Sequence, residues 1–230
     1  KVEANMYSNT DQVCQFDSIQ FFNSSTYNAT SFEWQFEGGS PTTSNEENPV
    51  VSFNQSGIYD VSLIVGGDDQ SDTIYFNDYV NIVAEPFIDL GVDTSMCEGE
   101  SIILDAGNHF SYEWNTDEET QTIIVDSTSN YSVIVNNEFG CFNSDSVGVV
   151  VFDLPLISLG NDTILCEGEI LDLNVEGDYL SINWSTGDTT GNVIIDSAGV
   201  YTVFVQDLNM CYNSDEIQVE FEVCVGINEI

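Results

Sequence analysis

The chain has 230 residues, of which 40 are Asp or Glu and only one, Lys1, is Lys or Arg, so its formal net charge is −39. Such a chain has no basic patch for nucleic acid or anionic lipid, and its carboxylates must be screened by groups from outside the chain. A content of 42% hydrophobic and 12% aromatic residues indicates a folded protein, and the apolar runs are too short to span a membrane.

Residues 1–85 contain the first set of predicted strands. Apolar and polar residues alternate through Tyr59, Val61, Leu63 and Val65, which is the period-2 pattern of a half-buried strand. Helical periodicity is not sustained anywhere in the chain. We therefore expect short β-strands that bury one face, with Trp34 in the core.

The rest of the chain is a close sequence repeat, and the segment from Lys1 to Glu85 is a more distant copy of it. The matching elements are Leu90-Gly91-Val92-Asp93-Thr94 with Leu159-Gly160-Asn161-Asp162-Thr163, Cys97-Glu98-Gly99-Glu100 with Cys166-Glu167-Gly168-Glu169, Trp114 with Trp184, and Cys141-x-Asn143-Ser144-Asp145 with Cys211-x-Asn213-Ser214-Asp215. The repeat predicts three successive β-sandwiches, each built around one tryptophan.

The first unit resembles the PKD domain, an immunoglobulin-like sandwich that is common in secreted modular proteins. Residues 32–39, 46–50 and 57–63 resemble the W-x-F-G-D, N-P and G-x-Y-x-V-x-L elements of that family. The Gly-Asp that usually follows the Trp strand is replaced by Glu37-Gly38-Gly39 here, so a ligand role of that Asp is not carried over to this chain.

The two later units resemble the immunoglobulin-like repeats that precede a C-terminal sorting domain in proteins exported by the type IX secretion system of Bacteroidota. The tail from Val223 to Glu229 resembles the segment that leads into this sorting domain, which is absent from the sequence. The resulting prediction is an all-β fold of three tandem immunoglobulin-like β-sandwiches in an elongated array. The expected boundaries are residues 1–85, 86–155 and 156–222, followed by a C-terminal tail at 223–230.

The six cysteines, which include no Cys-x-x-Cys, indicate disulfides and an extracellular location, secreted or at the cell surface. Equal positions in the two close repeats predict one disulfide within each, Cys97–Cys141 and Cys166–Cys211. Cys14 is then left over, because Asp69 stands where its partner is expected, and so is Cys224. Two interpretations follow: an intermolecular Cys14–Cys224 bond that links copies head to tail into a fibre, or two free thiols.

The acidic turn that contains Asp68, Asp69 and Asp72 also has two interpretations. Its oxygens could coordinate Ca²⁺, which prefers six to eight oxygen ligands from flexible loops. Alternatively, it is a solvated hairpin turn made of good turn-forming residues. No cofactor is required by either interpretation.

An Asp followed by Ser or Thr and then by an aliphatic residue, Ala or Thr resembles the O-glycosylation sequon that Bacteroidota use on exported proteins. Asp-Ser and Asp-Thr are also ordinary pairs at strand edges and turns, so covalent glycans and plain turns are both compatible with the pattern. The candidate positions are Ser18, Thr73, Ser127, Ser146, Thr163, Thr189 and Ser197.

Catalytic side chains are scarce, because His109 is the only histidine and Lys1 is the only lysine. Two carboxylates could form a glycosidase site, but small sandwiches rarely provide the necessary cleft. We expect a non-catalytic extracellular structural or adhesive protein, a rod of modules that forms a surface fibre or stalk, with copies of itself as partners and with neither nucleic-acid binding nor membrane insertion. The alternative is a carbohydrate-binding or spacer region of a larger secreted enzyme or adhesin.

Overall fold

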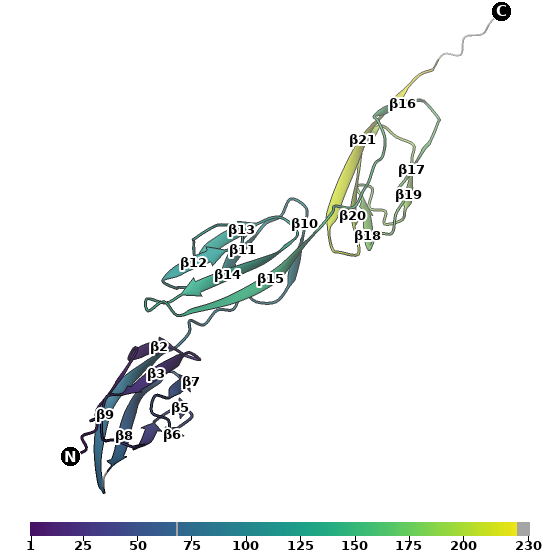
Figure 1. The fold of residues 1–230 in the computed structure, drawn as a ribbon. Coiled ribbons are helices and arrows are strands. Elements are labelled where there is room, and N and C mark those ends of the chain that lie inside the picture. The colour runs from purple at the N-terminus through teal and green to yellow at the C-terminus, as the bar shows by residue number, and fades with distance from the viewer. Residues whose placement is uncertain (68, 225–230) are drawn as a thin grey trace, which may run out of the picture. The chain divides into compact units, whose positions relative to one another are not determined.

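The computed structural model describes residues 1–67 and 69–224 (Figure 1). The regular secondary structure of these residues consists of β-strands, which confirms the all-β prediction. No helix in this part of the chain could cross a membrane. Strand pairing stays within three successive sets, which we call the first, second and third sandwich.

The first sandwich contains β1 to β9, arranged in a four-stranded sheet of order β1-β3-β7-β5 and a five-stranded sheet of order β2-β9-β8-β4-β6. Its aromatic core is centred on Trp34, which is fully buried, stacks on Phe36 at a centroid distance of 5.7 Å and contacts Phe21. The indole N–H of Trp34 donates to the carbonyl of Glu46 at 2.9 Å, so the polar atom of this buried ring is satisfied. The strands are β1 Met6–Ser8, β2 Gln12–Cys14, β3 Ser18–Asn23, β4 Ser31–Phe36, β5 Gly39–Ser40, β6 Thr43–Ser44, β7 Val50–Phe53, β8 Gly57–Gly67 and β9 Gln70–Val83.

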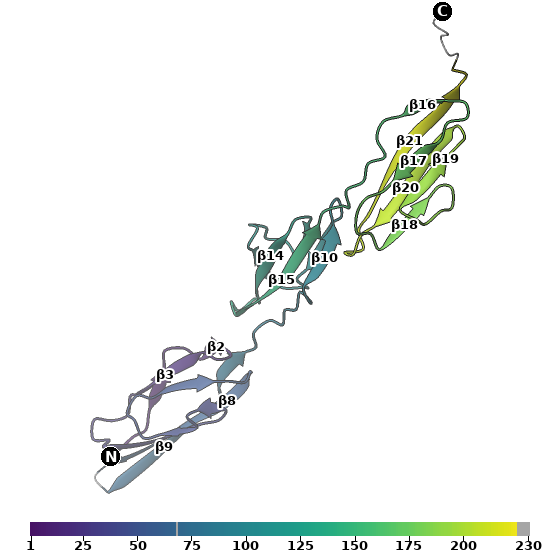
Figure 2. The same ribbon diagram turned by 90° about the vertical axis from the view of Figure 1, so that its right-hand side faces the viewer.

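The second and third sandwiches have the same strand order, as their repeated sequences require. Each has a four-stranded sheet, β10-β15-β14-β12 or β16-β21-β20-β18, and a two-stranded sheet, β11-β13 or β17-β19. Figure 2 labels the six strands of the third sandwich. The second contains β10 Thr94–Cys97, β11 Ile102–Asp105, β12 Ser111–Trp114, β13 Thr122–Val125, β14 Ser129–Asn136 and β15 Phe142–Phe152. The third contains β16 Thr163–Cys166, β17 Leu171–Asn174, β18 Ser181–Trp184, β19 Asn192–Ile195, β20 Gly199–Gln206 and β21 Tyr212–Glu222.

Alternation of buried and exposed residues explains the cores of these two sandwiches. On β14, Tyr131, Val133 and Val135 are buried, and Val203 and Val205 are buried at the corresponding positions of β20. Trp114 and Trp184 are also buried, and each indole N–H donates to a threonine carbonyl six residues later, at 2.8 Å. The predicted tryptophan cores are confirmed in all three sandwiches.

In every sandwich an early strand pairs in parallel with the last strand, and the early strand ends in a cysteine. The pairs are β2 with β9, β10 with β15 and β16 with β21. Their registers place Cys14 opposite Val83, Cys97 opposite Phe152 and Cys166 opposite Glu222. Each of these cysteines therefore lies beside the point where the chain leaves its sandwich.

The contacts between residues group the chain into two compact units. The residues of the second sandwich are shared between the two units. Residues 84–91, which leave the first sandwich, share one unit with the β14–β15 hairpin turn. Residues 153–160, which leave the second sandwich, share the other unit with the β20–β21 turn. We call residues 84–91 together with the β14–β15 turn the first junction, and residues 153–160 together with the β20–β21 turn the second junction. Each junction lies within a single unit.

Candidate functional site: the disulfide-linked junctions

Three disulfides connect all six cysteines, and two of them link consecutive sandwiches. Their Cα–Cα distances of 5.3 to 5.6 Å are those of ordinary disulfides. The predicted pairs within the repeats, Cys97–Cys141 and Cys166–Cys211, are wrong. The assignment of Cys14 and Cys224 to an intermolecular bond or to free thiols is also wrong, because neither cysteine is free. The pairs are Cys14–Cys141, Cys97–Cys211 and Cys166–Cys224.

The parallel pairing of early and last strands explains why the predicted pairs cannot form. Cys97 lies opposite Phe152 at the end of β15, whereas Cys141 directly precedes the start of that strand. At about 3.3 Å per residue, the length of β15 separates the two cysteines by roughly 35 Å, and a disulfide requires Cα atoms within about 7 Å. The same geometry separates Cys166 from Cys211 along β21.

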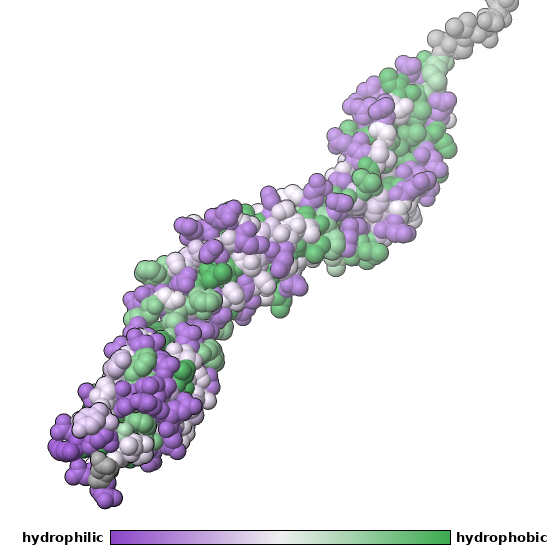
Figure 3. Space-filling model, viewed as in Figure 1, coloured by the Kyte–Doolittle hydropathy of each residue, from purple (hydrophilic) through white to green (hydrophobic). Residues whose placement is uncertain are grey.

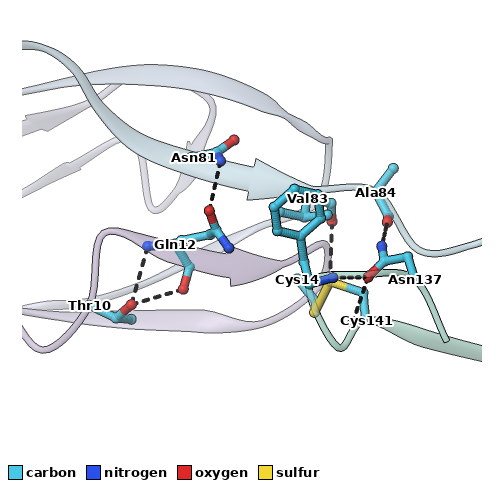
Figure 4. Close-up of a disulfide and its surroundings, with 9 residues drawn as sticks. Thr10, Gln12, Cys14, Asn81, Val83, Ala84, Asn137 and Cys141 are labelled. Carbon is cyan, nitrogen blue, oxygen red and sulfur yellow. Dashed lines mark hydrogen bonds between the residues drawn. A yellow bond between two sulfur atoms is a disulfide. The ribbon is translucent and has the colours of Figure 1, made fainter. Parts of the chain in front are cut away.

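At the first junction, Asn137 shapes the turn that presents Cys141 and also holds the chain that leaves the first sandwich (Figure 4). Its side-chain oxygen accepts the backbone N–H groups of Phe139 and Cys141, both at 3.0 Å. Its Nδ2 donates to the carbonyl of Ala84 at 3.0 Å. Cys141 is buried, with 1% of its surface exposed, so this disulfide is enclosed on one side.

The second junction reproduces this turn with an aspartate. Asp207 accepts the N–H groups of Asn209 and Cys211, both at 2.9 Å, and Cys211 is fully buried. A carboxylate cannot donate a hydrogen bond to a carbonyl, so Asp207 performs only the first of the two roles of Asn137.

The repeated Cys-x-Asn-Ser-Asp motif holds the connecting segment between two sandwiches at both junctions, and we call this set of hydrogen bonds the clamp. At the first junction, Asn143 Nδ2 donates to the carbonyl of Pro86 at 3.1 Å, and Asp145 accepts the N–H of Leu90 at 2.7 Å. The equivalent bonds of the second junction join Asn213 to Pro155 at 2.8 Å and Leu159 to Asp215 at 2.6 Å. The motif is recognisable in the sequence as a repeat, but only these contacts reveal its role, which is to fix the chain between sandwiches.

Other carboxylates also accept backbone N–H groups, which gives them partners in a chain that has almost no basic side chains. Glu100 and Glu169 accept the N–H of Cys97 and Cys166, each at 2.9 Å. Asp93 and Asp162 accept N–H groups of β15 and β21 at 2.8 and 2.9 Å. Hydrogen bonds to a charged acceptor are stronger than those between neutral groups, so backbone amides take the place of salt bridges here.

The third disulfide differs from the other two. Cys166 occupies the same register as Cys14 and Cys97, but its partner Cys224 lies only two residues beyond Glu222. In the earlier sandwiches the equivalent places are taken by Glu85 and Leu154. Cys166 is half-buried and Cys224 is exposed, so this bond is more accessible than the two at the junctions.

The acidic turn proposed as a Ca²⁺ site has another role at one of its residues. Asp72 accepts the backbone N–H of Ala4 at 2.9 Å, and this bond, followed by one from Thr73, lowers the pKa of its carboxyl group. Asp69 lies in the turn with a positive φ of 63°, and Asp68 is outside the described residues. Among the residues that the structure describes, no three His, Cys, Asp or Glu side chains are arranged to hold a metal ion.

A carboxyl–phenol pair that sequence reasoning missed lies on the first sandwich. The Tyr75 hydroxyl donates to Asp60 at 2.5 Å, and the N–H of Asp78 donates to the same carboxylate at 2.8 Å. These two bonds lower the pKa of Asp60, and the bond to Asp60 raises the pKa of Tyr75. Asp60 and Tyr75 lie 15 positions apart on the consecutive strands β8 and β9, and no sequence motif connects them.

The candidate glycosylation positions are mostly open to solvent. Ser18, Thr73, Ser127, Ser146, Thr189 and Ser197 are exposed, and Thr163 is half-buried at the start of β16. The surface shown in Figure 3 mixes hydrophilic with apolar residues.

Comparison with known proteins identifies the first sandwich. Residues 2–82 match the family model of the PKD domain. The first sandwich is a PKD/Ig-like domain. This agrees with the family resemblance seen in its sequence. Domains of this kind that contain disulfides are typical of extracellular proteins and are generally non-catalytic. A search of curated protein sequences finds no match.

Solved structures to which this chain is similar include titin domains I67–I69 in an E-to-A mutated variant, at 9% identity and a TM-score of 0.40, covering 96% of this chain and 99% of that chain. Extracellular domains 3–5 of Drosophila OTK match at 11% identity and a TM-score of 0.36, covering 94% and 96%. The insect immune protein hemolin matches at 11% identity and a TM-score of 0.36, covering 95% and 76%. The strand pairing described above is that of tandem Ig-like sandwiches. Similarities with TM-scores below 0.5 and identities this low add no argument about function.

Proposed function

We propose that this chain is a non-catalytic structural or adhesive part of an extracellular protein, in which the sandwiches serve as a covalently stapled spacer or stalk. The observation that carries the proposal is the pairing of the cysteines: Cys14–Cys141 and Cys97–Cys211 each tie one sandwich to the next. A spacer needs secured connections between its modules, and these disulfides secure them where the chain passes from sandwich to sandwich.

The hydrogen bonds of the junctions support the same role. Each junction has an Asn and an Asp at equivalent positions that hold the passing backbone, and both come from the strand that follows the bonded cysteine. These hydrogen bonds reduce the conformational freedom of the connecting segments, and the disulfide restricts them further. The two junctions are built alike, which is typical of a modular array and unlike a single binding site.

The charge of the chain is compatible with a hydrated extracellular spacer. Its one ion pair among the described residues joins Lys1 and Glu3 at 3.2 Å and is exposed. The other carboxylates accept hydrogen bonds from backbone amides or neutral side chains, or face solvent. A net charge of −39 opposes lateral association of copies, and since every cysteine is paired, a stalk fits better than a disulfide-linked fibre.

Export and modification form the finer part of the proposal. The resemblance of the later sandwiches to type IX cargo supports export by that route, and the exposure of six of the candidate hydroxyls supports O-glycosylation at those positions. The intact mass of protein from its native source tests the second point, because each glycan raises the mass above that of the 25.4 kDa polypeptide.

The test of the main proposal is antibody labelling of intact cells of the native source and of their culture medium. We expect labelling without permeabilisation, or antigen in the medium, and we expect antigen from either fraction to retain its disulfides on a non-reducing gel. Labelling that requires permeabilised cells would contradict an extracellular role.

A further inference from the structure

The disulfides create covalent shortcuts through the chain. Because Cys14 is bonded to Cys141, tension applied at Lys1 passes directly from residue 14 to residue 141 and bypasses residues 15–140. Because Cys166 is bonded to Cys224, tension then bypasses residues 167–223. The shortest covalent path from one end to the other is therefore made of residues 1–14, 141–166 and 224–230.

We propose that the chain is a tension-bearing strap whose maximum extension is set by these disulfides and not by the stability of its sandwiches. This inference rests on the proposed structural function and adds a mechanical property to it. At about 3.5 Å per residue, the three segments of the tension path together extend to roughly 160 Å. The 230 residues of a chain without disulfides would extend to roughly 800 Å.

Most of the hydrophobic core residues lie in the bypassed segments, whereas Val2 and Met6 of the first core and Val147 and Val149 of the second lie on the tension path. Trp34 and Trp114 are within residues 15–140, and Trp184 is within residues 167–223. Unfolding of these cores cannot lengthen the chain beyond the limit of the path, because the ends of each bypassed segment are covalently joined. Extension by successive unfolding of modules is thus blocked in this protein.

The segment between the two shortcuts must carry the tension through folded structure. This segment contains β15, the connecting residues 153–160 of the second junction, and β16. β15 lies between β10 and β14 in its sheet, and the passing backbone is held by the bonds of Asn213 to Pro155 and of Asp215 to Leu159. The clamp of the second junction therefore lies on the tension path, whereas the clamp of the first junction holds residues 84–91, which are bypassed.

The middle disulfide, Cys97–Cys211, is off the shortest path and acts as a reserve. If Cys166–Cys224 is lost, the path returns from residue 141 to 97 and crosses to 211, so that it consists of residues 1–14, 97–141 and 211–230. If Cys14–Cys141 is lost, the path runs through residues 1–97 and 211–230. Overlap of the disulfides keeps the extension limited after the loss of any one.

The experiment is single-molecule force spectroscopy on the full chain held at its two termini. Under oxidising conditions we expect a final contour length of roughly 160 Å, rising to roughly 800 Å when all cysteines are replaced by serine. C14S/C141S should reach roughly 410 Å and C166S/C224S roughly 280 Å. The matched control is C97S/C211S, which removes one disulfide and should leave the limit at roughly 160 Å.

Peptide mapping of the same samples without reduction verifies that the remaining cysteines keep their native partners. Final contour length is measured on the fully extended chain, so a loss of stability does not change the expected limit of a variant whose remaining cysteines keep their native partners. An oxidised chain that extends well beyond the limit of its tension path, or a C97S/C211S variant that lengthens, would overturn the proposal. Neither result bears on the extracellular location, which antibody labelling tests independently.

Discussion

The hydrogen bond from Leu90 to Asp145 offers a direct test of the junction clamp. The Leu90 N–H lies 2.7 Å from Asp145 Oδ2 in a half-buried setting, and its copy joins Leu159 to Asp215. In the Asp145→Leu variant the amide loses its charged acceptor. Hydrogen bonds to charged groups contribute about 1.5–3 kcal/mol, so we take about 2 kcal/mol for this one. That free energy corresponds to roughly a 30-fold change in an equilibrium constant.

Hydrogen exchange, followed by mass spectrometry, measures the change in the free energy of local opening at the Leu90 amide. In Asp145→Leu, a peptide that covers residues 84–92 should lose roughly 30-fold in protection at Leu90, because local opening becomes more favourable. The peptide that covers residues 153–160 serves as the internal control and should be unchanged. Asp145→Asn retains a carbonyl acceptor without the charge, so it should lose less protection than Asp145→Leu.

Two results would refute the reasoning. Unchanged exchange at Leu90 in Asp145→Leu would show that the hydrogen bond does not hold the passing chain. Equal loss of protection in both peptides would show a general destabilisation and not a local clamp.

Other expectations concern accessibility and pH. Under graded reduction followed by alkylation, Cys166–Cys224 should open before the junction disulfides, because Cys141 and Cys211 are buried; mass spectrometry showing the opposite order would contradict this. Because Asp60 has a lowered pKa in the folded state, its contribution to stability is present above its unfolded pKa near 3.8 and is lost as the pH falls through the folded value. The difference in urea midpoint between the native chain and Asp60→Asn should therefore shrink below about pH 4, and a constant difference would argue against the Tyr75 bond as its source.

Local signals in the sequence predicted the strands and the cores. Tyr131, Val133 and Val135 are buried and alternate with more exposed residues because only one face of β14 packs on the core. This alternation is visible within the sequence of a single strand. The burial of Trp114 and Trp184 followed from the same pattern and from the repeat. The strands and their buried residues depend on residues close together in the sequence, so they could be predicted from the sequence alone.

The pairing of cysteines could not be derived in this way. Equal positions of Cys97 and Cys166, or of Cys141 and Cys211, establish that their surroundings are alike but do not establish which cysteines are near each other. The clamp motif has the same difficulty, because the partners of its Asn and Asp at the first junction lie 57 and 55 positions earlier in the chain. A signal was present, because in the two copies the motif lies at almost the same distance from the chain segment it binds, 57 and 58 positions for the Asn and 55 and 56 for the Asp. The spacing alone does not specify contact.

The amino-acid sequence by itself determined that the chain folds as tandem tryptophan-centred sandwiches with a strongly anionic surface, since alternation and composition act over a few residues at a time. Only the tertiary structure decided that the disulfides cross from one sandwich to the next. The physical reason is the parallel pairing of an early strand with the last strand, which places the first cysteine of each sandwich at the chain's exit and leaves the second cysteine a full strand length away.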